Sequence, residues 1–193
     1  MNTTTKLHIY DVDGTILDSM RMWDRISLEY LASKGIKGPA ELKDILDPMT
    51  LEEAAAYLIE HFHLPVTLET ALDEIHDLIR DHYLYDLQLF PETMKELEAV
   101  AETGIPMVVL TNTPEAIVRI ALERTGALRF FRHIYTTEMG LKKDDPAIFR
   151  EVCRLEGVAP EEALVHEDSG YAIEAAEKAG CMIKVYDRYR GRE

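Results

Sequence analysis

The sequence has few cysteines, little positive charge and no long hydrophobic run. Two cysteines, Cys153 and Cys181, in 193 residues are too few for a disulfide-stabilised secreted scaffold and fit a reducing compartment better. Lys and Arg number 21 against 36 Asp and Glu, a formal net charge of −15, which disfavours nucleic acid and anionic membranes as partners. No apolar stretch approaches the ~18 residues of a membrane helix, and the N-terminus lacks a signal-peptide core. We therefore expect a cytoplasmic protein, with no obligate protein partner evident.

What is present is a regular alternation of strand-like and helix-like segments. Four short apolar runs predict buried strands, at residues 7–10, 105–110, 163–166 and 182–186. Helical patterns that open with proline or stop before glycine alternate with the last three runs, at residues 91–103, 114–125 and 169–179. This alternation predicts an α/β fold in which helices cover both faces of a parallel sheet.

A long segment without strands interrupts this pattern. Apolar residues fall at helical spacing between Met20 and Leu31, a capping box opens at Thr50 with Glu53, and a further helical stripe runs through residues 67–84. We therefore predict an all-helical domain at 19–88, inserted into an α/β core domain formed by 1–18 and 89–193. An insertion at a strand end lies over the edge where open α/β sheets bind ligands, so we expect it to act as a lid.

A pair of aspartates follows the first predicted strand directly, within residues 11–15 (Asp-Val-Asp-Gly-Thr). On an extended chain, two residues this far apart share one face at about 6–7 Å, and Gly14 allows a sharp turn just beyond them. Carboxylates at a strand end can hold an oxygen-seeking cation such as Mg²⁺, and one of them can attack an electrophile. Asp11 and Asp13 are therefore the strongest catalytic candidates.

Two other segments carry groups that suit phosphate binding. The strand at residues 105–110 runs into Thr111 and Asn112 just before a helix, where a hydroxyl and backbone N–H groups would meet the positive end of the helix dipole. Lys142 and Lys143 precede the next helix, and a lysine there could neutralise phosphate charge and orient the attacking carboxylate.

A third strand end carries Glu167 and Asp168. Because parallel strands place their carboxyl ends on one edge of the sheet, Asp11, Asp13, Thr111 and Asp168 are expected to converge there.

With these motifs in this order, the chain resembles the haloacid dehalogenase superfamily of phosphohydrolases, in the helical-cap branch close to the β-phosphoglucomutase-like phosphatases. Residues 11–19 match its first motif, Thr111-Asn112 its second, and 167–169 with 173–180 its fourth. The third motif departs from the usual Gly-Lys-Pro-x-Pro, so Lys143 rather than Lys142 is assigned by counting back from Pro146. The resemblance implies a Rossmann-like core with a helical cap domain.

The resemblance also implies a Mg²⁺-dependent phosphatase for a small phosphorylated metabolite, such as a sugar-phosphate-like monoester. Asp11 would form an aspartyl-phosphate, Asp13 would act as acid and then as base, and Lys143 would neutralise charge. Thr111 and Asn112 would bind the substrate. The Asp11 carboxylate, the Asp13 main-chain carbonyl and Asp168 would hold Mg²⁺, with Glu167 either a direct or water-mediated ligand or a residue behind the ligands.

Two alternative functions remain open. Sugar-phosphate mutases of this type carry a histidine and an arginine in the cap for a second phosphate, and the corresponding positions here are Trp23 and Leu51. Residues 19–88 also hold 6 basic against 14 acidic residues, which favours substrates with one phosphate and a neutral remainder. The second alternative is a non-catalytic ligand- or metal-binding regulator, although no member of the catalytic set is substituted.

Three remaining features have less specific interpretations. Trp23 either walls a pocket or packs within the first cap helix. His166 either packs in the sheet or tunes Glu167. The arginines near the C-terminus are expected to be solvated charges, at positions 188, 190 and 192.

Overall fold

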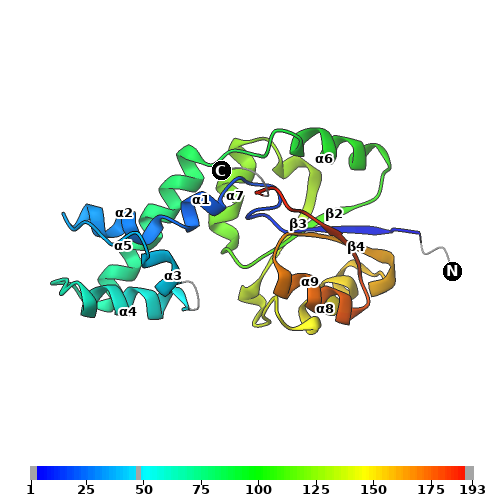
Figure 1. The fold of residues 1–193 in the computed structure, drawn as a ribbon. Coiled ribbons are helices and arrows are strands. Elements are labelled where there is room, and N and C mark those ends of the chain that lie inside the picture. Colours follow the sequence, from blue (N-terminus) through cyan, green and yellow to red (C-terminus); the bar gives the residue numbers. More distant parts are fainter. Residues whose placement is uncertain (1–3, 47–48, 190–193) are drawn as a thin grey trace. The chain divides into compact units, whose positions relative to one another are not determined.

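The computed structural model describes residues 4–46 and 49–189, so Arg190 and Arg192 lie outside the described residues. The chain forms two compact units (Figure 1). The sheet unit comprises Met1–Asp18 and Leu87–Glu193, and the helical unit comprises Ser19–Asp86. The units divide after Asp18 and after Asp86, and the boundaries expected from the sequence are after Asp18 and after Gln88.

A five-stranded parallel sheet forms the centre of the sheet unit, with the strand order β3-β2-β1-β4-β5. The strands are β1 (Leu7–Tyr10), β2 (Met107–Thr111), β3 (Phe131–Thr136), β4 (Ala163–Glu167) and β5 (Met182–Val185). Four of them match the predicted apolar runs. The fifth, β3, lies at the edge of the sheet and was not predicted, because its exposed Arg132 and His133 interrupt any apolar run.

Helices cover both faces of this sheet, as predicted for the α/β class. In Figure 1, α6 (Thr93–Glu102) and α7 (Glu115–Arg124) lie on one side, and α8 (Pro146–Glu156) and α9 (Gly170–Ala179) lie on the other. The α8/α9 side packs a continuous core in which Ile9 and Val165 meet Phe149 and Ala176. Buried alanines line α9, so this helix can approach the sheet closely.

The two chain segments that connect the units are hydrogen-bonded to each other within the sheet unit. Leu17 pairs with Leu89 in an antiparallel bridge. The Asp18 N–H donates to the Gln88 carbonyl at 2.9 Å, and the Phe90 N–H donates to the Ile16 carbonyl at 3.1 Å. The polypeptide therefore leaves and re-enters the sheet unit through one short paired strip, just beyond β1.

The helical unit contains α1 (Met20–Trp23), α2 (Ile26–Ser33), α3 (Leu42–Leu46), α4 (Leu51–His61) and α5 (Leu68–Asp81), followed by a π-helical turn at His82–Asp86. The predicted first helix is split into α1 and α2, and α3 was not predicted. The predicted capping box is confirmed, since Thr50 Oγ1 accepts from the Glu53 N–H and Glu53 Oε2 accepts from the Thr50 N–H. Among the described residues, no helix is long and apolar enough to cross a membrane.

A chain of buried polar side chains links the middle of the sheet to the C-terminal segment. His166 Nε2 lies 2.8 Å from His8 Nδ1, and the His166 ring stacks on Tyr10. The Tyr186 hydroxyl lies 3.3 Å from His166 Nδ1 and donates to Glu96 at 2.9 Å. His166 is therefore a packing residue of the sheet, paired with a second histidine.

Arg188 continues this network, and the expectation that it is a solvated charge is wrong. Its side chain is 10% exposed and pairs with Glu96 at 2.9 Å. Its Nε also donates to the Thr15 carbonyl at 3.2 Å. The arginine therefore fastens the C-terminal segment to the loop after β1, a contact that a local sequence pattern does not report.

Candidate active site

Asp11 lies at the point where β1 ends, and its side chain is buried. Its backbone N–H donates to the His166 carbonyl at 3.0 Å, so the residue is fixed to the neighbouring strand β4. Gly14, at a φ of 86°, turns the chain away from the sheet. The Asp11 side chain is 8% exposed. Burial raises the pKa of its carboxyl to about 7, against the opposing effect of the Lys143 charge.

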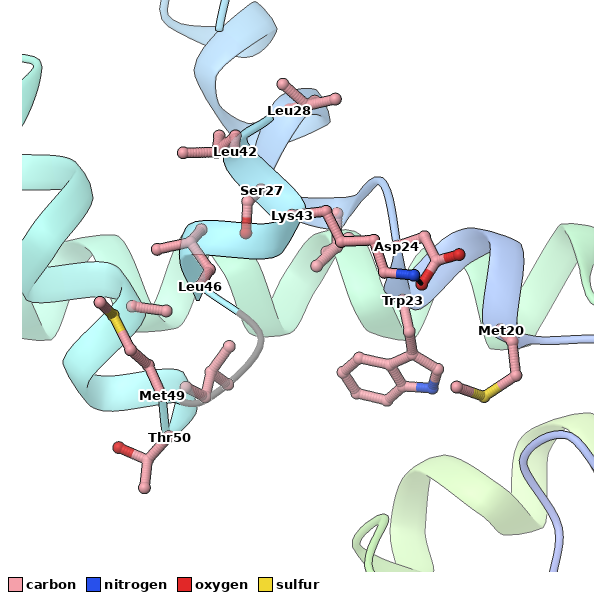
Figure 2. Close-up of a pocket in the computed structure, with 13 residues that line it drawn as sticks. Met20, Trp23, Asp24, Ser27, Leu28, Leu42, Lys43, Leu46, Met49 and Thr50 are labelled. Atoms are coloured by element: carbon pink, nitrogen blue, oxygen red, sulfur yellow. Dashed lines mark ion pairs between the residues drawn. The ribbon is translucent and has the colours of Figure 1, made fainter. Parts of the chain in front are cut away.

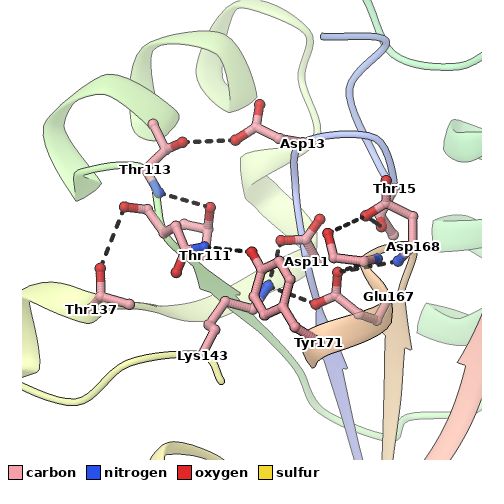
Figure 3. Close-up of polar contacts among 12 residues, drawn as sticks. Asp11, Asp13, Thr15, Thr111, Thr113, Thr137, Lys143, Glu167, Asp168 and Tyr171 are labelled. Atoms are coloured by element: carbon pink, nitrogen blue, oxygen red, sulfur yellow. Dashed lines mark hydrogen bonds and ion pairs between the residues drawn. The ribbon is translucent and has the colours of Figure 1, made fainter. Parts of the chain in front are cut away.

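Lys143 is the cation of this site. Its ammonium lies 2.6 Å from Asp11 Oδ1 and 2.6 Å from Glu167 Oε2 (Figure 3). Burial alone would lower the pKa of Lys143, but the two carboxylates hold it above its usual value. Lys143 is buried whereas its neighbour Lys142 is exposed, so the geometry favours the lysine chosen from the sequence.

Three carboxylates gather around one point next to this lysine. One oxygen from each of Asp11, Glu167 and Asp168 lies within 4.8 Å of the others. Burial raises the pKa of both the Glu167 and the Asp168 carboxyl. Among the described residues, Asp11 Oδ2 has no hydrogen-bond partner although it is buried. An acidic cluster with one lysine and an unsatisfied buried oxygen suits a hard divalent cation, which prefers oxygen ligands.

The oxygens of Glu167 and Asp168 are partly oriented by neighbouring donors. Glu167 Oε1 accepts from the backbone N–H groups of Asp168 and Ser169, both at 3.1 Å. Asp168 Oδ1 accepts from the hydroxyls of Ser169 at 3.3 Å and Thr15 at 3.5 Å. One Glu167 oxygen therefore accepts two backbone hydrogen bonds, and the other is paired with Lys143.

Asp13 stands apart from the acidic cluster. Its carboxylate Oδ2 accepts a hydrogen bond of 2.8 Å from the hydroxyl of Thr113, and Figure 3 shows the two side chains directed toward each other. Among the described residues, the carboxylates close enough to share one cation are those of Asp11, Glu167 and Asp168, without that of Asp13.

The segment after β2 differs from the open phosphate seat that the sequence suggests. Thr111 is buried at the end of β2, and its Oγ1 accepts from the Thr113 N–H at 3.2 Å. The first backbone N–H of α7, from Glu115, is taken by the Glu138 carboxylate at 3.1 Å. Because an acidic side chain already accepts the first N–H of this helix, the buried Thr111 hydroxyl is the donor that remains for an anion at this strand end.

Asn112 is exposed and turns toward α9. Its Nδ2 donates to the hydroxyl of Tyr171 at 2.8 Å, and the Thr137 hydroxyl lies 3.4 Å from its carbonyl. Thr113 and Tyr171 are the polar neighbours of the site that sequence reasoning missed. A threonine shortly before a helix and a half-exposed tyrosine carry no distinctive pattern by themselves, and only the fold brings them to the sheet edge.

The helical unit contains a separate pocket of about 250 Å³. Figure 2 shows Trp23 and Met20 of α1 lining it together with Leu46 and Met49. An ion pair of 2.8 Å between Lys43 and Asp24 lies among the lining residues. Trp23 therefore lines a pocket formed by residues of the helical unit itself.

The parallel sheet, the aspartate after β1 and the acidic pair after β4 define an α/β protein in which carboxylates at the strand ends surround a buried lysine. The family model described as haloacid dehalogenase-like hydrolase matches residues 8–185. The chain belongs to this family of enzymes, which confirms the family resemblance seen in its motifs.

Characterised relatives and solved structures agree with this assignment. A phosphoglycolate phosphatase from Pseudomonas aeruginosa is 28% identical over 97% of this chain and 72% of the relative. A phosphorylated carbohydrates phosphatase from Thermotoga maritima is 26% identical over 89% of this chain and 80% of the relative. The fold is shared with a crystal structure from Thermotoga maritima assigned as a candidate β-phosphoglucomutase, with a TM-score of 0.84 at 24% identity, covering 93% of this chain and 84% of that one.

Proposed function

We propose that the protein is a Mg²⁺-dependent phosphatase that hydrolyses a small phosphorylated metabolite through an aspartyl-phosphate on Asp11. The observation that carries this proposal is the buried Asp11 carboxylate, with one oxygen on Lys143 at 2.6 Å and the other unsatisfied beside two further carboxylates. The names of the similar proteins support it, since both relatives described above are phosphatases.

In the first half of the reaction, an Asp11 oxygen attacks phosphorus as the bond from phosphorus to the leaving oxygen breaks. Asp13 gives a proton to that leaving oxygen, and the alcohol departs. The Thr113 hydroxyl holds the Asp13 carboxylate at 2.8 Å, which fixes the direction in which the acid presents its proton. Lys143 and the Thr111 hydroxyl balance the charge of the phosphoryl oxygens.

In the second half, Asp13 accepts a proton from water as the water oxygen attacks phosphorus, which releases inorganic phosphate and restores Asp11. The Asp11 and Asp168 carboxylates and the Asp13 carbonyl would hold Mg²⁺, with Glu167 as a direct or water-mediated ligand. When bound, the ion supplies positive charge that neutralises the phosphate and favours the ionised form of the cluster. The raised pKa of Asp11 belongs to the metal-free site.

We infer that the preferred substrate is a sugar-phosphate-like monoester with a neutral remainder. The helical domain 19–88 carries 6 basic and 14 acidic residues, so a second anionic group would meet a repulsive field. Phosphoglycolate, the substrate named for the Pseudomonas aeruginosa relative, carries such a group, and a direct comparison of the two substrate types therefore tests the inference. Glycolate release at a higher kcat/KM than any sugar release would contradict it.

The experiment is hydrolysis of p-nitrophenyl phosphate with and without Mg²⁺ by the wild-type protein, Asp11→Asn and Asp144→Asn. Asp144 is an exposed acid close to Lys143 in sequence, so it controls for the loss of one negative charge. We expect metal-dependent release in the wild type and Asp144→Asn, and none in Asp11→Asn. Equal rates in all three proteins would indicate a contaminating phosphatase.

Trapping of the intermediate distinguishes this reaction from its alternatives. Protein quenched with acid during turnover should carry a phosphoryl group on the peptide that contains Asp11. Interconversion of sugar phosphates without release of phosphate would instead indicate a mutase. Binding without turnover across a panel of phosphate esters would indicate a regulator.

A further inference from the structure

Tyr171 stands at the candidate site, although no catalytic motif includes it. It is the second residue of α9, two positions after Ser169, and its side chain is half-exposed at 49%. Figure 3 shows Tyr171 among the labelled site residues, with its hydroxyl directed toward the segment that carries Thr111. The charges of Lys143, Glu167 and Asp11 all act on its phenol, so the side chain lies within the electrostatic field of the nucleophile and its cation.

The phenol is fixed in place by a bond from the neighbouring strand end. Asn112 Nδ2 donates to the Tyr171 hydroxyl oxygen at 2.8 Å. This bond joins the end of β2 to the first turn of α9, and so links two of the strand ends that meet at the sheet edge.

The direction of that hydrogen bond determines what the phenol can still offer. An amide nitrogen only donates, so the tyrosine oxygen accepts, and the single phenolic hydrogen remains to be donated. Burial raises the pKa of Tyr171, which keeps this hydrogen in place at neutral pH. The site therefore presents a neutral O–H donor next to Asn112 at the end of β2, within the field of the Lys143 charge, and an anion bound at these strand ends is a suitable acceptor.

We propose that Tyr171 is a substrate-contacting residue whose phenolic O–H donates to an oxygen of the phosphate group, and that Asn112 positions it for this contact. The proposal rests on the function proposed above. Because the contact is made to the phosphate, which all substrates share, its contribution is the same whatever alcohol the substrate carries. Asn112 then affects substrate binding by holding the Tyr171 hydroxyl in position, in addition to any contact that its own side chain makes with the substrate.

The test compares wild type with Tyr171→Phe, which keeps the ring and removes the hydroxyl. The matched control is Tyr85→Phe, because Tyr85 is a 68% exposed tyrosine of the helical unit. The measurements are calorimetric binding of inorganic phosphate in the presence of Mg²⁺, and KM and kcat for p-nitrophenyl phosphate, a sugar phosphate and phosphoglycolate. Thermal melting verifies that each variant is folded.

We expect Tyr171→Phe to weaken phosphate binding and raise KM by about ten- to a hundredfold, the usual effect of removing a hydrogen bond to a charged group. The factor should be equal for the three substrates, and Tyr85→Phe should match the wild type. Asn112→Ala should reproduce part of the loss. The double variant should lose less than the product of the two single factors, since both act on one contact.

Two results would overturn the proposal. Unchanged phosphate affinity in Tyr171→Phe would show that the phenol does not contact the phosphate, and a loss that depends on the alcohol would assign the contact to the leaving group. A wild-type protein that neither binds phosphate nor hydrolyses any ester would refute the proposed function itself. That outcome is distinct from an active wild type with an unaffected Tyr171→Phe variant.

Discussion

Replacing Lys143 by methionine tests how much its buried ion pairs stabilise the fold, and the readout is the free energy of unfolding rather than activity. The lysine is 3% exposed and Asp11 is 6% exposed. The ammonium lies 2.6 Å from each of two carboxylate groups, Asp11 and Glu167. Lys143→Met keeps a side chain of similar length but leaves the acidic cluster without its cation.

The expected cost is large because the carboxylates that remain cannot reach water. Breaking a buried ion pair by removal of one partner costs about 3–5 kcal/mol, whereas loss of a surface pair costs about 0–1 kcal/mol. Urea unfolding followed by circular dichroism measures the difference. The control is Lys142→Met, in which an adjacent exposed lysine is lost, and it should change the free energy of unfolding by less than about 0.5 kcal/mol.

Magnesium adds a second readout to the same experiment. The ion should stabilise Lys143→Met more than wild type, because it would supply positive charge to a cluster that now has none of its own. A loss below about 1 kcal/mol for Lys143→Met in the absence of Mg²⁺ would refute the argument. It would mean that the carboxylates take up protons at little cost when the lysine is missing.

Three further predictions concern the acidic cluster, the histidine pair and a helix cap. Asp168→Asn should weaken Mg²⁺ binding at least about tenfold in calorimetry, because an amide replaces a charged ligand; unchanged affinity would remove Asp168 from the metal site. Burial lowers the pKa of His166 from 6.5 to about 2. Below pH 6.5 the unfolded chain therefore binds a proton that the folded chain does not, and the free energy of unfolding should fall by about 2 kcal/mol between pH 7.5 and 5. His166→Gln should flatten that slope, and an equally steep slope would assign it to other groups. Thr50→Ala removes the capping box of α4 and should cost about 1 kcal/mol in urea unfolding; no change would show that packing alone holds this helix end.

Local sequence patterns predicted most of the strands and helices of the sheet unit. The predicted helix at 169–179 corresponds to α9, Gly170–Ala179, because Ser169 and Gly180 bound a continuous helical stripe. The strand β3 was missed because its exposed Arg132 and His133 interrupt the apolar run. The single helix expected before Gly35 is two helices, with a break between Trp23 and Ile26 that apolar spacing alone does not indicate.

The candidate site was predictable to the extent that its residues end strands. Asp11, Glu167 and Asp168 meet because β1 and β4 are neighbours in a parallel sheet, and sheet geometry alone leads to this result. Contacts made by side chains from loops were not predictable. The backbone N–H of Thr113 donates to Thr111, and that of Glu115 donates to Glu138, so two N–H groups that were expected to be open to phosphate are occupied. These bonds depend on loop conformations that no sequence periodicity indicates.

Because Leu17 pairs with Leu89, the helical domain could be removed from the chain and the two cut ends joined directly. The Asp18 N–H already donates to the Gln88 carbonyl at 2.9 Å, as in an antiparallel pair that a tight hairpin turn can connect. A two- or three-residue turn could thus replace everything between them without altering the path of β1 or the loop that bears Asp11. Exchange of one inserted module for another would therefore leave Asp11 and the carboxylates beside it in place, so the insertion and the strand-end cluster can change independently in such a chain.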